Sequence, residues 1–270
     1  MDNRPVGVFD SGIGGLSLVS EVKRQLPGEG VVYIADVERQ PFGEKSAQEV
    51  IRISREIADE LLRLGAKAIV VACSTATAVA LPSLRESCGV PVVGIITDRL
   101  VDDICRATRT KKIGIISTEL TAKSGSFKKA IEAADPSLSV CSAACSELVN
   151  MISEGQIFDE RIVKAVDAHI APLLAQGADT LVLGCTHFNF IADIIAPLVS
   201  RRMTVISPPE ATVAALAGIL DERGLRSGKG GNPSYRYLST GDTESFTRLV
   251  RRLWRDGGGA GIEHFDWVRE

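Results

Sequence analysis

Short apolar runs alternate with amphipathic stretches along most of the chain. The apolar runs lie between turn residues, at 5–9, 31–34, 90–96, 138–141, 204–207 and 236–239. Runs of this kind are typical of strands that are buried on both faces of a sheet. Between them, apolar residues recur at helical spacing and predict helices over 46–64, 124–133, 161–174, 211–220 and 243–254. Strands that alternate with helices in this way predict an α/β fold with mostly parallel sheets.

Two further stretches are similar to each other. Residues 65–75 and 177–187 align without a gap at an offset of 112, and each contains a Gly-Ala turn, an apolar run, a small residue and a cysteine. Residues 112–118 likewise resemble 5–11 at an offset of 107. A repeat of two strand types predicts two similar α/β units that face one another. Since the second unit is then complete, we expect the last strands to return to the first, which gives these units: 1–97 plus 207–270, and 98–206.

The composition is that of an ordinary globular protein, with 45% hydrophobic residues, 24% charged residues and a net charge of −3. No run of like charges is long enough to predict binding to nucleic acid or to an anionic membrane. No stretch of about 18 residues is apolar enough to span a membrane. The N-terminus lacks the apolar core of a signal peptide, so we expect a cytoplasmic protein.

The cysteines bear on both redox state and metal binding. There are six of them: Cys73, Cys88, Cys105, Cys141, Cys145 and Cys185. In a cytoplasmic protein we expect free thiols rather than disulfides. Zinc sites are usually built from closely spaced ligand pairs. Cys185 and His187 form one such pair and no second pair is evident, so the sequence predicts no metal site.

Two of the cysteines occupy equivalent places in the repeat. Cys73 and Cys185 each end a buried strand and precede a predicted helix start, where ligands bind in open α/β sheets and where the helix dipole favours a thiolate. Asp10, at the end of the equivalent first strand, and His187 are candidate proton partners. One thiol with a base would suit nucleophilic catalysis. Two thiols related by pseudo-symmetry favour proton removal and return on opposite faces of one carbon.

A glycine-rich turn follows the first strand, at 10–15. It lacks the third glycine of a dinucleotide-binding loop. Backbone N–H groups at a helix N-terminus can bind an anion, and a carboxylate would fit as well as a phosphate. The alternative is a simple tight turn between strand and helix.

These motifs, in their order and spacing, resemble the cofactor-independent aspartate/glutamate racemase superfamily, and its glutamate racemases in particular, over nearly the whole length. The matching segments are Gly7-Val8-Phe9-Asp10-Ser11-Gly12-Ile13-Gly14-Gly15, Pro41-Phe42-Gly43, Ala72-Cys73, Thr75-Ala76, Thr118 with Thr121 and Ser124, and Leu183-Gly184-Cys185-Thr186-His187. The resemblance implies two flavodoxin-like, three-layer domains with mostly parallel sheets, related by a pseudo-twofold axis. It also implies a two-cysteine mechanism without a cofactor, and the supply of D-glutamate for peptidoglycan.

Several positions depart from the pattern of that family. Ser74 stands where Asn is usual, Phe42 where Tyr is usual, and Ser153 where Glu is usual. Losing an amide and a phenol hydroxyl removes hydrogen-bonding groups from a pocket for two carboxylates. Since buried polar groups discriminate strongly between substrates, these changes bear on the choice of substrate rather than on the chemistry.

The resemblance assigns the following roles by position. Cys73 and Cys185 act on opposite faces of Cα, with Asp10 and His187 assisting proton movement. The substrate-binding residues are Asp10, Ser11, Pro41, Phe42, Gly43, Ser74, Thr75, Thr118, Thr121, Thr186 and His187. The expected partner is a small acidic amino acid, and a homodimer is a possible assembly. Two alternatives stay open: an isomerase for aspartate or another acidic or substituted amino acid, and a binding or regulatory protein that has lost turnover.

Overall fold

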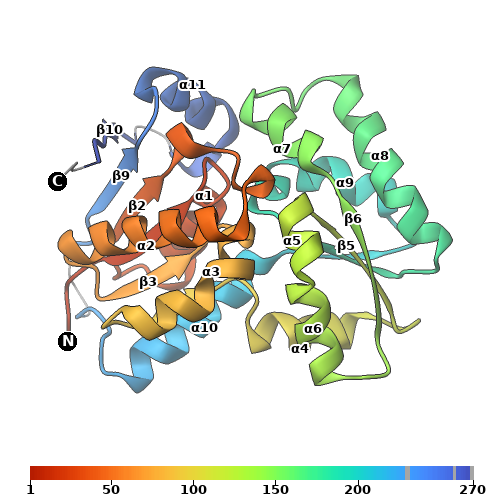
Figure 1. Ribbon diagram of the computed structural model, residues 1–270, viewed down its shortest axis with the longest axis horizontal. Coiled ribbons are helices and arrows are strands. Elements are labelled where there is room, and N and C mark those ends of the chain that lie inside the picture. Colours follow the sequence, from red (N-terminus) through yellow and green to blue (C-terminus); the bar gives the residue numbers. More distant parts are fainter. Residues whose placement is uncertain (229–231, 258–259, 268–270) are drawn as a thin grey trace.

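The computed structural model describes residues 1–228, 232–257 and 260–267. Two parallel sheets lie side by side, each with helices packed against it (Figure 1). The larger sheet contains, in spatial order, β10 (Ile262–His264), β9 (Tyr235–Ser239), β2 (Val31–Ala35), β1 (Val6–Asp10), β3 (Ala68–Val71) and β4 (Val92–Gly94). The smaller sheet contains β6 (Ser139–Ala144), β5 (Lys112–Ser117), β7 (Thr180–Leu183) and β8 (Thr204–Ile206). The predicted α/β class with mostly parallel sheets is confirmed.

Helices connect the strands in alternation. The α-helices are α1 (Leu16–Gln25), α2 (Ala47–Arg63), α3 (Ser74–Ser87), α4 (Asp98–Ala107), α5 (Glu119–Ser124), α6 (Ser126–Ala134), α7 (Ser146–Ser153), α8 (Glu160–Ala175), α9 (Ala192–Val199), α10 (Pro208–Glu222) and α11 (Thr243–Leu253). Short 3₁₀ turns occur at η1 (Val37–Arg39), η2 (Phe42–Glu44), η3 (Thr186–Ile191) and η4 (Arg255–Gly257). No helix in the described ranges is both long and apolar enough to cross a membrane.

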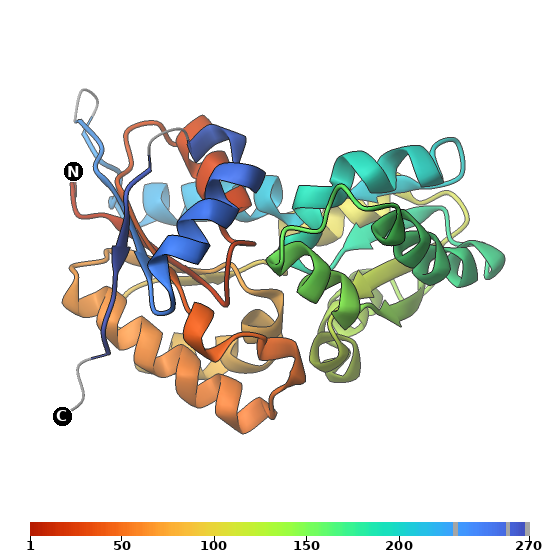
Figure 2. The ribbon, with the colours of Figure 1, turned by 90° about the horizontal axis from the view of Figure 1, so that it is seen from above.

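The larger sheet is the middle of three layers. Its strands β1, β2 and β3 are buried throughout, as their unbroken apolar runs predict. One face packs on α2 and α3 in a cluster that includes Phe9, Ile53 and Leu84. The other face packs on α1 and α10 in a cluster that continues into the smaller half and includes Val8 and Leu216. The view from above shows the two halves as neighbouring lobes (Figure 2).

The internal repeat corresponds to equivalent strands. The spatial order β2-β1-β3-β4 in one sheet recurs as β6-β5-β7-β8 in the other. Beyond the paired strands, Ala72 N–H donates to Phe9 O at 2.9 Å, and Gly184 N–H donates to Ile116 O at 2.8 Å. The small residue before each cysteine therefore makes the same bond in both halves. Cys73 and Cys185 therefore follow equivalent strands at equivalent positions.

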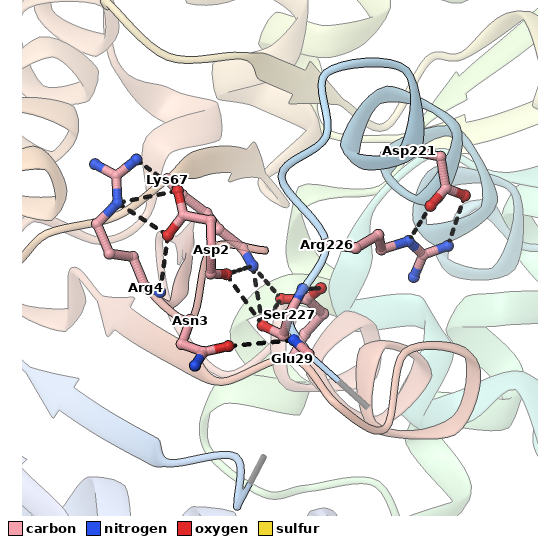
Figure 3. A network of polar contacts seen from close by, with 9 residues as sticks. Asp2, Asn3, Arg4, Glu29, Lys67, Asp221, Arg226 and Ser227 are labelled. Atoms are coloured by element: carbon pink, nitrogen blue, oxygen red, sulfur yellow. Dashed lines mark hydrogen bonds and ion pairs between the residues drawn. The ribbon is translucent and has the colours of Figure 1, made fainter. Parts of the chain in front are cut away.

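The C-terminal part returns to the larger sheet, where β9 pairs with β2 and β10 pairs with β9. A polar network at the other end of this sheet also joins distant segments (Figure 3). There the buried Lys67 ammonium lies 2.5 Å from the Glu29 carboxylate, and both groups bond to Ser227 beyond α10. These pairings support the proposed division into 1–97 plus 207–270 and 98–206, which stays a prediction.

Candidate active site

Both repeat cysteines line one pocket between the two sheets. Cys73 follows β3 as the N-cap of α3, and Cys185 follows β7. The helix expected after Cys185 begins as the 3₁₀ turn η3, so the dipole at this thiol is smaller than at Cys73. Of the predicted site residues, these line the pocket: Ser11, Pro41, Phe42, Gly43, Cys73, Ser74, Thr75, Thr118, Cys185, Thr186 and His187. Asp10 and Thr121 lie behind them.

Both thiols are held in their neutral form. Cys73 and Cys185 are only 4% and 5% exposed. Burial, together with the negative charge of Asp10, raises the pKa of Cys73 to about 12. Burial also raises the pKa of Cys185 well above its ordinary value, although a backbone hydrogen bond from His187 opposes the shift. The helix start at Cys73 therefore does not overcome desolvation, contrary to the expectation of a depressed pKa.

Asp10 connects the first strand to the second half. Its carboxylate accepts hydrogen bonds from the Gly12 N–H and from Thr186 Oγ1, both at 2.9 Å. Burial nevertheless raises the pKa of Asp10 to about 6. The glycine-rich turn thus binds an anion, as its N–H groups predict, but the anion is a side chain of the protein. At Gly14 a Cβ would lie 2.2 Å from Thr186 Oγ1, so only glycine permits this approach.

His187 lies beside the second thiol. Its Nδ1 is 3.9 Å from Cys185 Sγ, which agrees with the predicted pairing of a thiol and a base. Burial lowers the pKa of His187 to about 4, so the ring is neutral at pH 7. Beside the other thiol, Ser11 Oγ is 3.9 Å from Cys73 Sγ. Each thiol therefore has a polar neighbour of its own within the pocket.

Three hydroxyl groups meet where the two halves touch. Thr75 Oγ1 lies 2.9 Å from Thr118 Oγ1 and 3.3 Å from Thr121 Oγ1, and the last two are 2.9 Å apart. Ser74 Oγ, nearby, is buried and has no hydrogen-bond partner in the described part of the chain. A buried hydroxyl without a partner costs free energy unless a ligand satisfies it. This wall of the pocket therefore offers donors that suit a carboxylate.

Sequence reasoning missed three residues that line the pocket: Glu44, Ser146 and Val149. Ser146 begins α7, directly after the edge strand β6, and Val149 lies one turn later. The rule that ligands bind at the carboxyl ends of strands could have found them. Within the described ranges, no group of three His, Cys, Asp or Glu side chains could hold a metal ion. All six cysteines are free thiols.

A family model and the curated relatives of this chain all describe racemases. The family model for Asp/Glu/hydantoin racemases matches residues 13–216. The chain is 39% identical to the glutamate racemase of Corynebacterium diphtheriae over 253 residues, which cover 94% of this chain and 95% of that protein. It is 36% identical to the glutamate racemase of Exiguobacterium sibiricum over 248 residues, which cover 92% of this chain and 91% of that protein.

Solved structures of glutamate racemases also match this chain. The crystal structure of glutamate racemase isoform RacE1 from Bacillus anthracis matches with a TM-score of 0.93 and 34% identity, covering 100% of both chains. That of the Francisella tularensis glutamate racemase in complex with D-glutamate matches with a TM-score of 0.87 and 30% identity, covering 100% of this chain and 98% of that one. An aspartate racemase from Picrophilus torridus, at 18% identity and a TM-score of 0.56, shares the fold.

Proposed function

Because the chain belongs to the Asp/Glu/hydantoin racemase family, we propose that it interconverts L- and D-glutamate in the cytoplasm and supplies D-glutamate for peptidoglycan. The observation that carries this proposal is the pair of thiols from equivalent strand ends in one pocket. The Francisella tularensis relative was crystallised with D-glutamate. This supports our proposal that the substrate is a small acidic amino acid, and we further propose that the protein assembles as a homodimer.

The mechanism needs a base on each face of the substrate Cα. The thiolate of Cys73 removes the Cα proton from one face, and the thiol of Cys185 gives a proton to the other face; the reverse direction exchanges these roles. When Cys73 is the base, its thiol proton first passes to the nearby Asp10 carboxylate. In the reverse direction, where Cys185 is the base, His187 Nδ1 first takes up the Cys185 thiol proton. The reaction moves only protons, and we propose that the two thiols carry it without a metal or an organic cofactor.

The substrate carboxylates need donors in the pocket. We place one of them against the Ser74 and Thr75 side of the wall, where a buried hydroxyl is free to donate. The other would lie toward Ser11 and the loop that carries Phe42. Charge-assisted hydrogen bonds of this kind are roughly twice as strong as neutral ones, so they can fix Cα between the thiols.

The test is proton exchange in deuterated water. The purified protein is incubated with each enantiomer of glutamate and of aspartate, without added cofactor. Loss of the Cα–H signal is followed by proton NMR and inversion by chiral chromatography. We expect exchange and inversion of glutamate from both sides. Faster turnover of aspartate would favour the alternative substrate, to which Phe42 and Ser74 point, and no exchange with any acidic amino acid would favour an inactive homologue.

A further inference from the structure

The side chain of Gln40 bridges the two halves of the protein beside the pocket. Gln40 follows η1 and directly precedes Pro41, which lines the pocket. Its Nε2 donates to Oγ of Ser153, the last residue of α7, at 2.7 Å. Since an amide carries its donor and its acceptor on opposite branches, this bond turns Gln40 Oε1 away from Ser153. The orientation of the amide is therefore set by the second half of the molecule.

The amide oxygen and the His187 imidazole both border Gly12. A Cβ at Gly12 would lie 2.0 Å from Gln40 Oε1 and 3.4 Å from His187 Nε2, so both atoms stand beside the same α-carbon. His187 Nε2 is buried and has no hydrogen-bond partner among the described residues. Buried imidazole nitrogens normally have a partner, and Gln40 Oε1 is an acceptor beside this one. Gly12 leaves the space that the two side chains need.

We propose that Gln40, oriented by Ser153, is a positioning residue for His187: after a shift of the two side chains, its Oε1 accepts a hydrogen bond from Nε2–H of the neutral ring. The inference rests on the proposed function, in which His187 serves Cys185. A neutral imidazole carries one proton, and the partner of one nitrogen decides the state of the other. With the proton on Nε2, Nδ1 presents a lone pair toward Cys185 Sγ, 3.9 Å away. The opposite tautomer cannot accept the thiol proton.

Burial independently keeps the ring neutral at pH 7, because it lowers the pKa of His187 to about 4. Two tautomers are then available, and only one of them serves as a base for the thiol. A base that is itself oriented by a third group is the general arrangement for activating a nucleophile. Here the third group is an uncharged amide, which fixes the tautomer without favouring the imidazolium.

The tautomer can be observed directly, without any assay of activity. The chain contains three histidines, and His169 and His264 lie in pairs with Glu147 and Asp266 on the surface. Replacing both by Asn leaves one imidazole in ¹⁵N-histidine-labelled protein, whose protonated and unprotonated nitrogens resonate far apart. We expect Nε2–H in this background, with and without glutamate. Gln40→Met, which keeps the length but removes the amide, should give a mixture of tautomers, whereas Gln40→Glu should keep Nε2–H.

Kinetics supply a second, direction-specific readout. The equilibrium constant between enantiomers is one, so kcat/KM must stay equal in both directions, and isotope effects carry the information. In Gln40→Met, kcat should fall about 10–100-fold, less than the full contribution of a general base. The primary isotope effect with α-deuterated substrate should rise for the enantiomer that Cys185 deprotonates and fall for the other. A merely structural defect would not change the isotope effects of the two enantiomers in opposite directions.

Matched variants complete the design. Ser153→Ala removes the hydrogen bond that orients the Gln40 amide. It should change the tautomer population and the isotope effects in the same directions as Gln40→Met does. If Gln40→Met does not fold, Ser153→Ala tests the proposal in its place. Gln48→Met, on the exposed face of α2, should change neither readout. Nδ1–H as the main tautomer of the parent protein would overturn the proposal, as would an unchanged tautomer in both Gln40→Met and Ser153→Ala. Because the spectrum does not depend on turnover, it decides this proposal even if glutamate proves not to be the substrate.

Discussion

Replacing Lys67 by Met tests the buried ion pair that holds the first half together (Figure 3). Lys67 and Glu29 are 0% and 2% exposed, and their charged atoms are 2.5 Å apart. Removing one partner of such a pair leaves a buried charge and typically costs about 3–5 kcal/mol. In Lys67→Met the Glu29 carboxylate keeps two donors, the N–H and the hydroxyl of Ser227. We therefore expect the free energy of unfolding to fall by about 3 kcal/mol, the lower end of that range.

The double variant separates the charge effect from packing. Lys67→Met combined with Glu29→Gln removes both charges while keeping similar volumes. It should be more stable than the sum of the single changes by about 1–3 kcal/mol, since contacting residues couple by that order. The measurement is urea unfolding followed by circular dichroism at 25 °C. Lys123→Met is the matched control, because Lys123 forms an exposed pair with Glu119 at 2.9 Å and such pairs contribute little.

Two results would contradict the reasoning. A loss below about 1 kcal/mol in Lys67→Met would mean that water or rearrangement satisfies Glu29, so the pair does not tie the N-terminal segment to the chain beyond α10. Strict additivity of the two changes would mean that the charges do not interact in the folded protein. Either outcome would leave strand pairing, rather than this network, as the link between the ends of the chain.

Four further predictions concern activity. Cys73→Ala and Cys185→Ala should each lower interconversion of glutamate enantiomers at least about 10²-fold in polarimetry, and near-normal turnover in either would exclude the two-thiol mechanism. Ser74→Asn with Phe42→Tyr should raise kcat/KM for glutamate about tenfold, at about 0.5–1.5 kcal/mol for each hydrogen bond gained; unchanged values would show that these positions do not set specificity. Because burial raises the pKa of Asp10 to about 6, kcat/KM should increase as pH rises through that value and the carboxyl ionises, and Asp10→Asn should remove this limb of the profile. Dialysis against chelator should leave activity intact, and restoration by a metal or pyridoxal phosphate after a loss would overturn the cofactor-independent mechanism.

The internal repeat made much of this site predictable from the sequence. Strand ends are set by local apolar runs, and parallel strands place their carboxyl ends at one edge of a sheet, so Cys73 and Cys185 could be assigned to equivalent positions. Asp10 and His187 followed from their places beside those strand ends. All five predicted helices also agree with the structure to within three residues at each end, most closely in α8 and α11. The local sequence pattern is sufficient to identify a strand where both faces of that strand are buried.

The remainder depends on contacts that no local pattern encodes. Gln40 and Ser153 are 113 positions apart and meet only because the two halves close on each other. Val149 was missed because no helix was predicted after the strand at 138–141, although α7 follows β6 there. The sequence likewise suggests that the glycine-rich turn binds a ligand, whereas its N–H groups hold Asp10. Which partner satisfies a donor is a property of tertiary packing.

The high pKa of both thiols has a consequence for when the chemistry can begin. Burial raises the pKa of Cys73 to about 12 and the pKa of Cys185 well above its ordinary value, so neither is a thiolate in the free protein at pH 7. A thiolate is the form that oxidants and other electrophiles attack, so the closed pocket protects both sulfur atoms. In the proposed reaction a bound amino acid would bring its α-ammonium group near the thiols, and a nearby positive charge lowers the pKa of a thiol. The negative charge of the substrate carboxylates would oppose this lowering of the thiol pKa. Hydrogen-bond donors such as Ser74 Oγ offset that charge. Carboxylate binding is therefore needed before the substrate ammonium can favour the thiolate.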